Sequence, residues 1–135
     1  MIQSLNERHA LVTGAGSGIG AAIALSLAQH GCRLTLAGRS QETLQKQAEH
    51  IRQHVPEVSV ILAPLDVTDP GSVQAGLAMA QSRLGPVNIL VNNAGQAESQ
   101  PFLRTDSDLW QRTLAVNLTG TYHMTHATLP GMLEA

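Results

Sequence analysis

Short apolar runs alternate along this chain with longer segments in which apolar residues recur every three or four positions. Apolar runs of this length predict strands, and a three- to four-residue spacing predicts amphipathic helices. Four strands are expected, at about 8–12, 33–37, 58–65 and 87–91. A helix is expected after each strand, at about 17–30, 41–55, 70–84 and from 106 to the end of the sequence. In the first helix, the apolar residues Ile19, Ile23 and Leu27 recur at helical spacing.

Helix ends are marked by local residue choice. Ser40 and Asp69 are placed to be N-caps of the second and third helices, and either Asp106 or Ser107 is placed to cap the fourth. Gly31 follows the first helix as a C′ residue, because glycine tolerates the left-handed backbone found there. These signals agree with the helix bounds that the apolar spacing predicts.

The order of strand then helix, four times over, indicates an α/β fold. Three of the strands are apolar throughout rather than alternating, as expected when both faces of a sheet are covered. Right-handed crossovers then give a doubly wound parallel sheet, a Rossmann-type αβα sandwich with strand order 3-2-1-4. Its ligand crevice should lie at the carboxyl ends of the strands, where the order reverses between the first and fourth. Residues 1–135 are expected to belong to one domain.

Composition narrows the classes of protein that this chain can be. Hydrophobic residues make up 43% of the 135 residues and charged residues 13%, as in a globular domain with a sizeable core. The net charge is −2 and there is no basic tract, so no nucleic-acid partner is expected. No apolar run approaches the ~18 residues of a membrane span, and the first residues do not resemble a signal peptide. Cys32 is the one cysteine, so an internal disulfide is excluded and a cytoplasmic location is expected.

The segment 13–20, Thr-Gly-Ala-Gly-Ser-Gly-Ile-Gly, lies between the first strand and the first helix. Glycines let a chain turn sharply and approach a pyrophosphate closely, and the following helix presents free N–H groups to the phosphate oxygens. A P-loop would need Gly-Lys-Ser/Thr at the helix start, but Ala21 and Ala22 follow Gly20. A methyltransferase-type loop would have an acid at Val12. The dinucleotide fingerprint Gly-x-Gly-x-x-Gly fits only loosely, because Gly14 and Gly16 match but its third glycine would fall on Ile19.

This loop, Thr-Gly-x-x-x-Gly-Ile-Gly, resembles the cofactor loop of the short-chain dehydrogenase/reductase family. The resemblance implies cofactor contacts from Gly14, Ser17, Gly18, Ile19 and Gly20. Three further features extend the resemblance over the whole chain. Asp66 and Val67 follow the third strand, where the family binds the adenine of its cofactor. The segment 92–95, Asn-Asn-Ala-Gly, resembles the family's segment that braces the sheet and lines the adenosine ribose, which implies cofactor contacts from Asn93, Ala94 and Gly95. Asn117 stands where the family has the asparagine of its proton relay, at a helix kink.

The end of the second strand indicates which cofactor the chain prefers. An acid there would bind the ribose hydroxyls of NAD and repel the 2′-phosphate of NADP. This chain has Gly38 at the family's acid position, followed by Arg39 and Ser40. A guanidinium is a forked cation suited to a phosphate, and a serine hydroxyl can add a hydrogen bond. The resemblance therefore implies NADP as the cofactor, with NAD as the alternative.

The resemblance stops short of the family's catalytic serine, tyrosine and lysine, which lie beyond its asparagine. The one tyrosine, Tyr122, has His126 four residues later, and the one lysine, Lys46, is on the second helix. We therefore expect the front portion of a longer enzyme, truncated after the fourth strand and its helix, and no useful hydride transfer by the 135 residues alone. His123 and His126 have a spacing compatible with metal binding, but no nearby acid or cysteine completes a site, so no metal is expected.

The leading functional hypothesis is an NADP(H)-dependent oxidoreductase that interconverts a carbonyl and a secondary alcohol of a small molecule. A non-catalytic nucleotide-binding or interaction protein is the alternative if the chain ends at Ala135, and a methyltransferase-like nucleoside binder is a third reading, against which Gly38 and Arg39 argue. The substrate cannot be identified from these residues. The family resemblance also implies a homodimer or homotetramer formed through the last helix, which carries the apolar residues Leu118, Tyr122 and Leu129.

Overall fold

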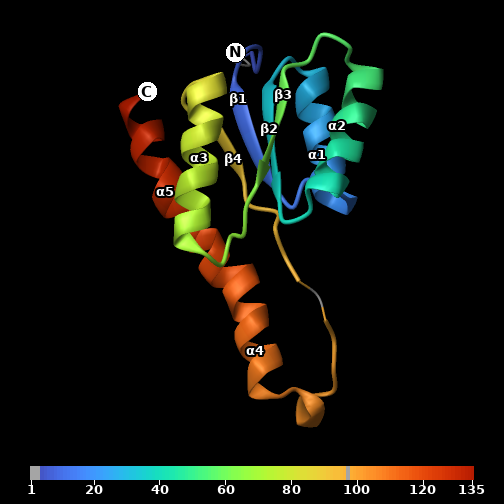
Figure 1. Cartoon of the computed structure of the whole chain (residues 1–135), viewed down its shortest axis with the longest axis vertical. Coiled ribbons are helices and arrows are strands. Elements are labelled where there is room, and N and C mark those ends of the chain that lie inside the picture. The colour runs from blue at the N-terminus through green and yellow to red at the C-terminus, as the bar shows by residue number, and fades with distance from the viewer. Residues whose placement is uncertain (1–3, 97) are drawn as a thin grey trace.

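A computed structural model of the chain describes residues 4–96 and 98–135. Four parallel strands form one sheet in the order β3-β2-β1-β4, which confirms the predicted doubly wound order. Helices α1 and α2 cover one face of the sheet, and α3 and α5 cover the other (Figure 1). The bounds are β1 His9–Thr13, α1 Gly18–Gln29, β2 Arg33–Gly38, α2 Gln41–His54, β3 Val60–Pro64, α3 Pro70–Leu84, β4 Ile89–Val91, α4 Ser107–Leu114 and α5 Gly120–Glu134.

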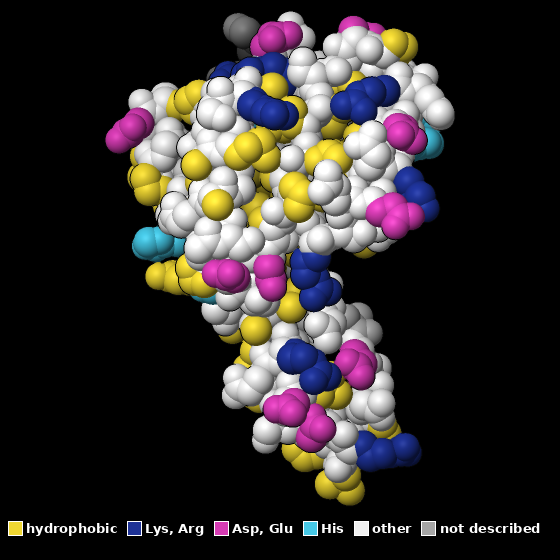
Figure 2. Space-filling model, viewed as in Figure 1, with side chains coloured by type: hydrophobic (Ala, Val, Ile, Leu, Met, Phe, Trp, Pro, Cys, Tyr) yellow, Lys and Arg dark blue, Asp and Glu magenta, His cyan; other side chains and the backbone are white. Residues whose placement is uncertain are grey.

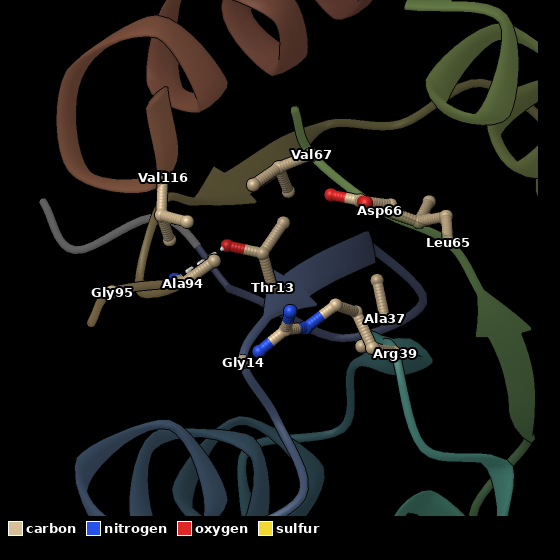
Figure 3. Close-up of a pocket in the computed structure, with 11 residues that line it drawn as sticks. Thr13, Gly14, Ala37, Arg39, Leu65, Asp66, Val67, Ala94, Gly95 and Val116 are labelled. Atoms are coloured by element: carbon tan, nitrogen blue, oxygen red, sulfur yellow. Dashed lines mark hydrogen bonds between the residues drawn. The ribbon is translucent and has the colours of Figure 1, made fainter. Parts of the chain in front are cut away.

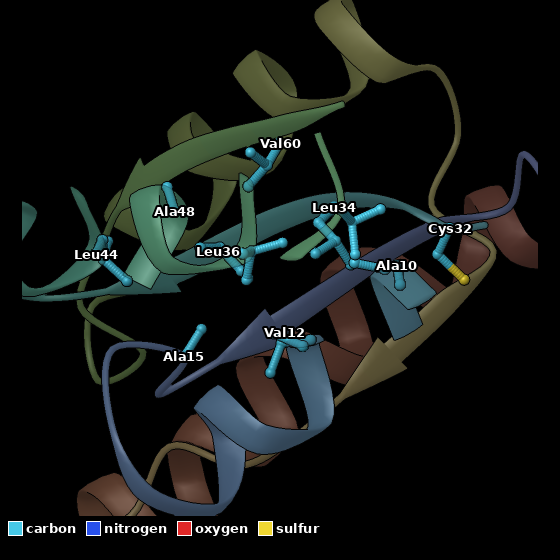
Figure 4. Close-up of a cluster of buried hydrophobic side chains, with 13 residues drawn as sticks. Ala10, Val12, Ala15, Cys32, Leu34, Leu36, Leu44, Ala48 and Val60 are labelled. Atoms are coloured by element: carbon cyan, nitrogen blue, oxygen red, sulfur yellow. The ribbon is translucent and has the colours of Figure 1, made fainter. Parts of the chain in front are cut away.

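The sheet is buried on both faces by two separate hydrophobic clusters. Ala10 and Val12 of β1 pack in the cluster under α1 and α2, which Figure 4 shows. Leu11, between them in sequence, points to the opposite face and packs with α3 and with Met124 of α5. Successive strand side chains alternate between faces, so a strand covered on both sides needs apolar residues at every position. This is why the sequence shows continuous apolar runs.

Helix α1 packs on the sheet through its smallest residues. Gly20, Ala24 and Ala28 are the buried residues of this helix. Ile19, one of the apolar residues that recur at helical spacing, is 74% exposed. Small residues allow the helix to lie close to the strands, so the larger side chains are displaced to the rim of the contact. Apolar spacing predicted the helix, but it did not predict which face is innermost.

The predicted helix caps are confirmed. The side chains of Ser40, Asp69 and Asp106 each accept a hydrogen bond from a backbone N–H in the first turn of the following helix. Asp106, rather than Ser107, is therefore the cap of α4. Gly31 has φ of 90°, the left-handed conformation expected of a C′ glycine.

The last predicted helix is interrupted. Helices α4 and α5 are joined by a π-helical segment, Ala115–Thr119, and a 3₁₀ turn, Phe102–Arg104, lies within the loop that precedes α4. Gly120 begins α5 in contact with the loop after β3, where a Cβ would stand 2.5 Å from Val67 Cγ2. Tertiary contact therefore explains a glycine that helix propensity does not.

Helix α4 and its preceding loop project from the α/β body (Figure 1). Hydrophobic side chains are visible at the lower end of this projection (Figure 2), and the exposed large apolar residues of the segment are Phe102, Leu103 and Trp110. Within the described ranges, β3 and β4 form the two edges of the sheet, and the three residues of β4 are only half-buried. None of the helices described is long and apolar enough to span a bilayer.

Candidate functional site

A cleft of about 540 Å³ opens at the carboxyl ends of the four strands. Figure 3 shows its lining, to which Thr13 and Gly14 contribute from the end of β1 and Ala94 from the loop after β4. Arg39 enters from the end of β2 and Asp66 from the segment after β3. The cleft lies at the edge of the sheet where the doubly wound order predicts a ligand. The remaining lining residues are Ala37, Gly38, Leu65, Val67, Gly95 and Val116.

The hydroxyl of Thr13 holds the loop after β4 against the glycine loop. Thr13 Oγ1 accepts hydrogen bonds from the backbone N–H groups of Asn93, at 3.0 Å, and Ala94, at 2.9 Å. The same hydroxyl donates to the carbonyl of Val91 at 3.3 Å. Thr13 is almost fully buried, so its hydroxyl takes its hydrogen-bond partners from these backbone groups rather than from water. One side chain therefore sets the spacing of the two loops that border the cleft.

Asn93 and Gly20 fit together beneath the glycine loop. Asn93 Nδ2 donates to the carbonyl of Gly14 at 3.1 Å. A Cβ at Gly20 would stand 2.3 Å from Asn93 Nδ2 and 2.4 Å from the oxygen of Gly14. No side chain fits at such distances, so this glycine serves contact within the protein. We predicted Gly20 and Asn93 as cofactor contacts, and the structure places them in the support of the loop.

The start of α1 has the features of a phosphate site. Its N-cap, Ser17, makes no side-chain hydrogen bond to the first turn, and no acidic residue lies in that turn. Gly18 has φ of +60°, and a Cβ built on it would meet nothing within 4 Å. Ile19 is exposed beside it. The first N–H groups of this helix are therefore open to an anion that approaches the backbone at Gly18.

A second hollow, of about 510 Å³, adjoins the cleft between the glycine loop and the start of α2. Arg39 lines both spaces, and Ser40 lines the second. Both side chains are exposed. In Figure 3 the guanidinium of Arg39 extends over the cleft toward the Gly14 side. The two predicted phosphate-binding residues are therefore beside the glycine loop, with a cation and a hydroxyl available to a ligand.

Asp66 combines a local structural bond with a place in the cleft. Its Oδ1 accepts hydrogen bonds from the hydroxyl of Thr68, at 2.7 Å, and from the backbone N–H of Thr68, at 2.9 Å. These bonds hold the pKa of the Asp66 carboxyl below its usual value, and attraction to Arg39 acts in the same direction, while burial opposes them. Asp66 is therefore ionised at neutral pH and can accept a hydrogen bond from an amino group in the cleft. Val67 lines the cleft next to it.

Asn117 lies within the π-helical segment, and this is the position at which the family resemblance implied a helix kink. Its side-chain amide is joined by two hydrogen bonds to the backbone of Gln96. A Cβ at Gly95 would stand 3.0 Å from Asn117 Oδ1, so the loop passes close to this side chain. Asn117 itself is not among the residues that line the cleft.

The structure brings most of the predicted site residues to one edge of the sheet. Those that line the two hollows are Gly14, Ser17, Arg39, Ser40, Asp66, Val67, Ala94 and Gly95. Sequence reasoning did not assign Thr13, Ala37 or Val116 to the site. Thr13 stood in the motif immediately before the first glycine, which was the one available signal. Val116 had none, because it lies in the π-helical segment before α5, which local apolar spacing does not reveal.

The histidines of α5 form no metal site in the described part of the chain, where no group of three or more potential ligands occurs. His123 Nδ1 is hydrogen-bonded to the carbonyl of Val67 at 2.7 Å. The ring of Tyr122 lies near both His123 and His126, with centroid separations of 5.9 and 5.3 Å. These residues line a separate hollow between α3 and α5 and do not reach the cleft.

Comparison with known proteins gives a family for this arrangement. A family model described as short chain dehydrogenase matches residues 8–135. An uncharacterised oxidoreductase of Staphylococcus aureus is 41% identical over 130 residues, covering 96% of this chain and 54% of that protein. A similarly described protein of Staphylococcus saprophyticus is 37% identical, with 96% of this chain and 55% of the relative covered. The chain thus spans about half the length of the curated relatives it matches.

Solved structures of other proteins have the same fold as this chain. A short-chain type dehydrogenase/reductase from Mycobacterium marinum superposes with a TM-score of 0.92 at 32% identity, over 97% of this chain and 52% of that one. L-Sorbose reductase from Gluconobacter frateurii, solved in complex with NADPH and L-sorbose, superposes with a TM-score of 0.86 at 28% identity. That match covers 96% of this chain and 50% of the reductase.

Proposed function

The chain belongs to the short-chain dehydrogenase/reductase family, and from this premise we propose that the whole protein interconverts a carbonyl and a secondary alcohol with NADP(H). The observation that carries the proposal is the cleft at the carboxyl ends of the strands. The hollow that adjoins it joins a helix start without a side-chain cap bond, suited to a pyrophosphate, to a cation and a hydroxyl suited to a further phosphate. When bound, the nicotinamide supplies or accepts the hydride, and the protein holds and orients it.

The residues around the cleft fit a dinucleotide along its length. The pyrophosphate would lie on the N–H groups after Ser17, where Gly18 leaves open space. The adenine would reach Asp66, whose ionised carboxylate accepts a hydrogen bond from the ring amino group. Between them, the backbone of Ala94 and Gly95 would border the adenosine ribose.

Preference for NADP(H) over NAD(H) is supported by Arg39 and Ser40. Charge-assisted hydrogen bonds are worth about 1.5–3 kcal/mol each, which corresponds to at least one decade in affinity. Gly38 precedes them, so no carboxylate stands where it would repel a 2′-phosphate. The NADPH complex of the related L-sorbose reductase is in line with this choice. We infer that Asn117 supports proton transfer by fixing the chain around the π-helical segment rather than by touching cofactor.

The test is direct measurement on the intact protein. NADPH should bind at least about tenfold more tightly than NADH in a fluorescence titration. NADPH consumption should require a carbonyl compound from a panel of ketones, sugars and 3-oxoacyl thioesters. Failure to bind either cofactor would overturn the proposal. Tight binding without turnover of any carbonyl would favour the non-catalytic nucleotide-binding alternative, and equal affinities would remove the NADP preference alone.

We further propose that the protein forms a homodimer or homotetramer through α5. Large apolar side chains are exposed at successive turns of the π-helical segment and α5, namely Leu118, Tyr122, Leu129 and Leu133. Such a stripe suits packing against a second helix of the same kind. Tyr122→Asp should reduce the molar mass measured by light scattering. The control Gln53→Asp, at an exposed position of α2, should leave that molar mass unchanged. A monomeric unmutated protein would exclude this assembly.

A further inference from the structure

We propose that Thr43 is a positioning residue that fixes the direction of the Ser40 hydroxyl and so favours a 2′-phosphate over a 2′-hydroxyl in the hollow beside α2. This inference rests on the proposed use of NADP(H). It goes beyond that proposal by naming a residue that selects the cofactor without touching it. Thr43 lies in the first turn of α2, three positions after the cap Ser40.

The oxygen of Ser40 already receives two hydrogen bonds from Thr43. The backbone N–H of Thr43 donates to Ser40 Oγ at 3.3 Å, and Thr43 Oγ1 donates to it at 2.9 Å. A hydroxyl has two lone pairs and one hydrogen. With both lone pairs engaged, Ser40 has only its hydrogen left to offer. Both hydrogen bonds recorded for Ser40 Oγ among the described residues are bonds that it accepts, and the exposed side chain can donate to a ligand.

The hollow next to Ser40 is where this direction matters. Arg39, Ser40 and Thr43 line it together with Gly16 and Ser17 of the glycine loop. An ionised phosphate only accepts hydrogen bonds, so it matches a hydroxyl that can only donate. A ribose 2′-hydroxyl oxygen can also accept this hydrogen bond, but as a neutral acceptor it binds more weakly than an ionised phosphate, and Ser40 Oγ has no lone pair left for its hydrogen. A chain of hydroxyls that all donate in one direction is also mutually polarised, which strengthens the last bond.

Thr43 is held in place by the glycine loop. A Cβ at Gly16 would stand 2.6 Å from Thr43 Cγ2, so the methyl group of Thr43 fills the space that a side chain at position 16 would occupy. The side chain is half-buried there. Its methyl group contacts the loop proposed to bind pyrophosphate, while its hydroxyl faces Ser40. Thr43 therefore links the two phosphate-binding elements.

Thr43→Val in the intact protein tests the hydroxyl alone, because valine retains the methyl that meets Gly16. Affinity for NADPH should fall about three- to tenfold, and affinity for NADH should change less than twofold. Thr43→Ser, which keeps the hydroxyl, should retain the preference of the unmutated protein. The probes 2′,5′-ADP and 5′-AMP should repeat the pattern without the nicotinamide.

A double-mutant cycle shows whether Thr43 acts through Ser40. In a Ser40→Ala background, Thr43→Val should cause no further loss of NADPH affinity. Additive losses of NADPH affinity in the double variant would overturn the inference. It would also be overturned if Thr43→Val lowered the affinities for NADPH and NADH equally while the melting temperature stayed unchanged. If the unmutated protein binds neither cofactor, the proposed function fails instead. If it binds both equally, the preference fails before Thr43 is tested, and the inference fails with it.

Discussion

Asn117 and Gln96 are joined by a pair of hydrogen bonds that imitates two paired backbone strands. Asn117 Oδ1 accepts from the backbone N–H of Gln96 at 2.8 Å, and Asn117 Nδ2 donates to the carbonyl of Gln96 at 2.9 Å. The two residues are 21 positions apart in the chain. Only a primary amide offers a donor and an acceptor in this geometry. The pair fixes the loop that follows β4 to the π-helical segment before α5.

Asn117→Ala should therefore slow the intact enzyme while leaving the cofactor bound. Both bonds to Gln96 are lost, so the loop and the π-helical segment can move relative to each other. We expect a fall in kcat of about 10- to 100-fold, because misplacement near the reacting groups is costly. The dissociation constant of NADPH should change less than about threefold, since one neutral residue outside the cleft is altered.

Thr119→Ala is the matched control for this prediction. Thr119 is exposed in the same π-helical segment and is given no role in the site. The kcat of the Thr119→Ala variant should equal that of the unmutated protein. An Asn117→Ala enzyme with full kcat would show that the Gln96 pair is dispensable.

Thr13→Val should destabilise the protein by about 2 kcal/mol or more. The change keeps the shape of the side chain but leaves the N–H groups of Asn93 and Ala94 without their acceptor. Each buried donor left unsatisfied costs about 1–3 kcal/mol. Thr13→Ser keeps the hydroxyl and should cost about 1 kcal/mol for one buried methyl group. Chemical unfolding measures the loss of unfolding free energy in both variants. If Thr13→Val were no less stable than Thr13→Ser, the proposed role of the hydroxyl would be contradicted.

Gly38→Asp combined with Arg39→Ala should reverse the order of cofactor affinities. A carboxylate at position 38 would bind the ribose hydroxyls and repel a 2′-phosphate, while the cation is removed. The structure admits the new side chain, since a Cβ at Gly38 meets only the flexible end of Leu44, at 3.3 Å. Fluorescence titration with NADPH and NADH provides the measurement. Arg83→Ala, at the far end of α3, should leave the order unchanged.

His9 should make the stability of the fold depend on pH. Its ring is fully buried in β1, with Nδ1 donating to the carbonyl of Gly85 at 2.9 Å and Nε2 lying 2.7 Å from Thr35 Oγ1. Burial lowers the pKa of His9 below 6.5, and the charge of Arg33 lowers it further, while the bond to Gly85 opposes the shift. The folded protein therefore binds fewer protons than the unfolded chain below about pH 6.5.

Unfolding free energy should consequently be constant above about pH 7 and should fall as the pH drops through 6.5 toward the lowered pKa of His9. Denaturant titrations between about pH 8 and 5 measure this slope. His9→Gln should flatten it, because the substitution removes the buried titratable ring. A slope that survives in His9→Gln would assign the effect to other groups.

The glycine loop shows how far sequence could predict the site. Its position between a strand and a helix followed from local patterns, and the structure confirms both elements. The different roles of its glycines could not be predicted from local patterns. Gly18 leaves open space for a ligand, whereas Gly20 makes room for Asn93. That difference depends on a residue far along the chain, which no pattern within the loop records.

The sequence by itself determined the elements, their order and, through both-sided apolar strands, a parallel sheet with helices on two faces. These features follow from short continuous apolar runs, from apolar spacing near 3.6 residues and from caps, all of which are local. The tertiary structure decided what depends on contacts between distant segments. It buried Gly20, Ala24 and Ala28 rather than Ile19, and it placed Thr13 against residues 80 and 81 positions later. Close packing selects such partners by shape and unsatisfied hydrogen bonds, and neither is visible until the chain has folded.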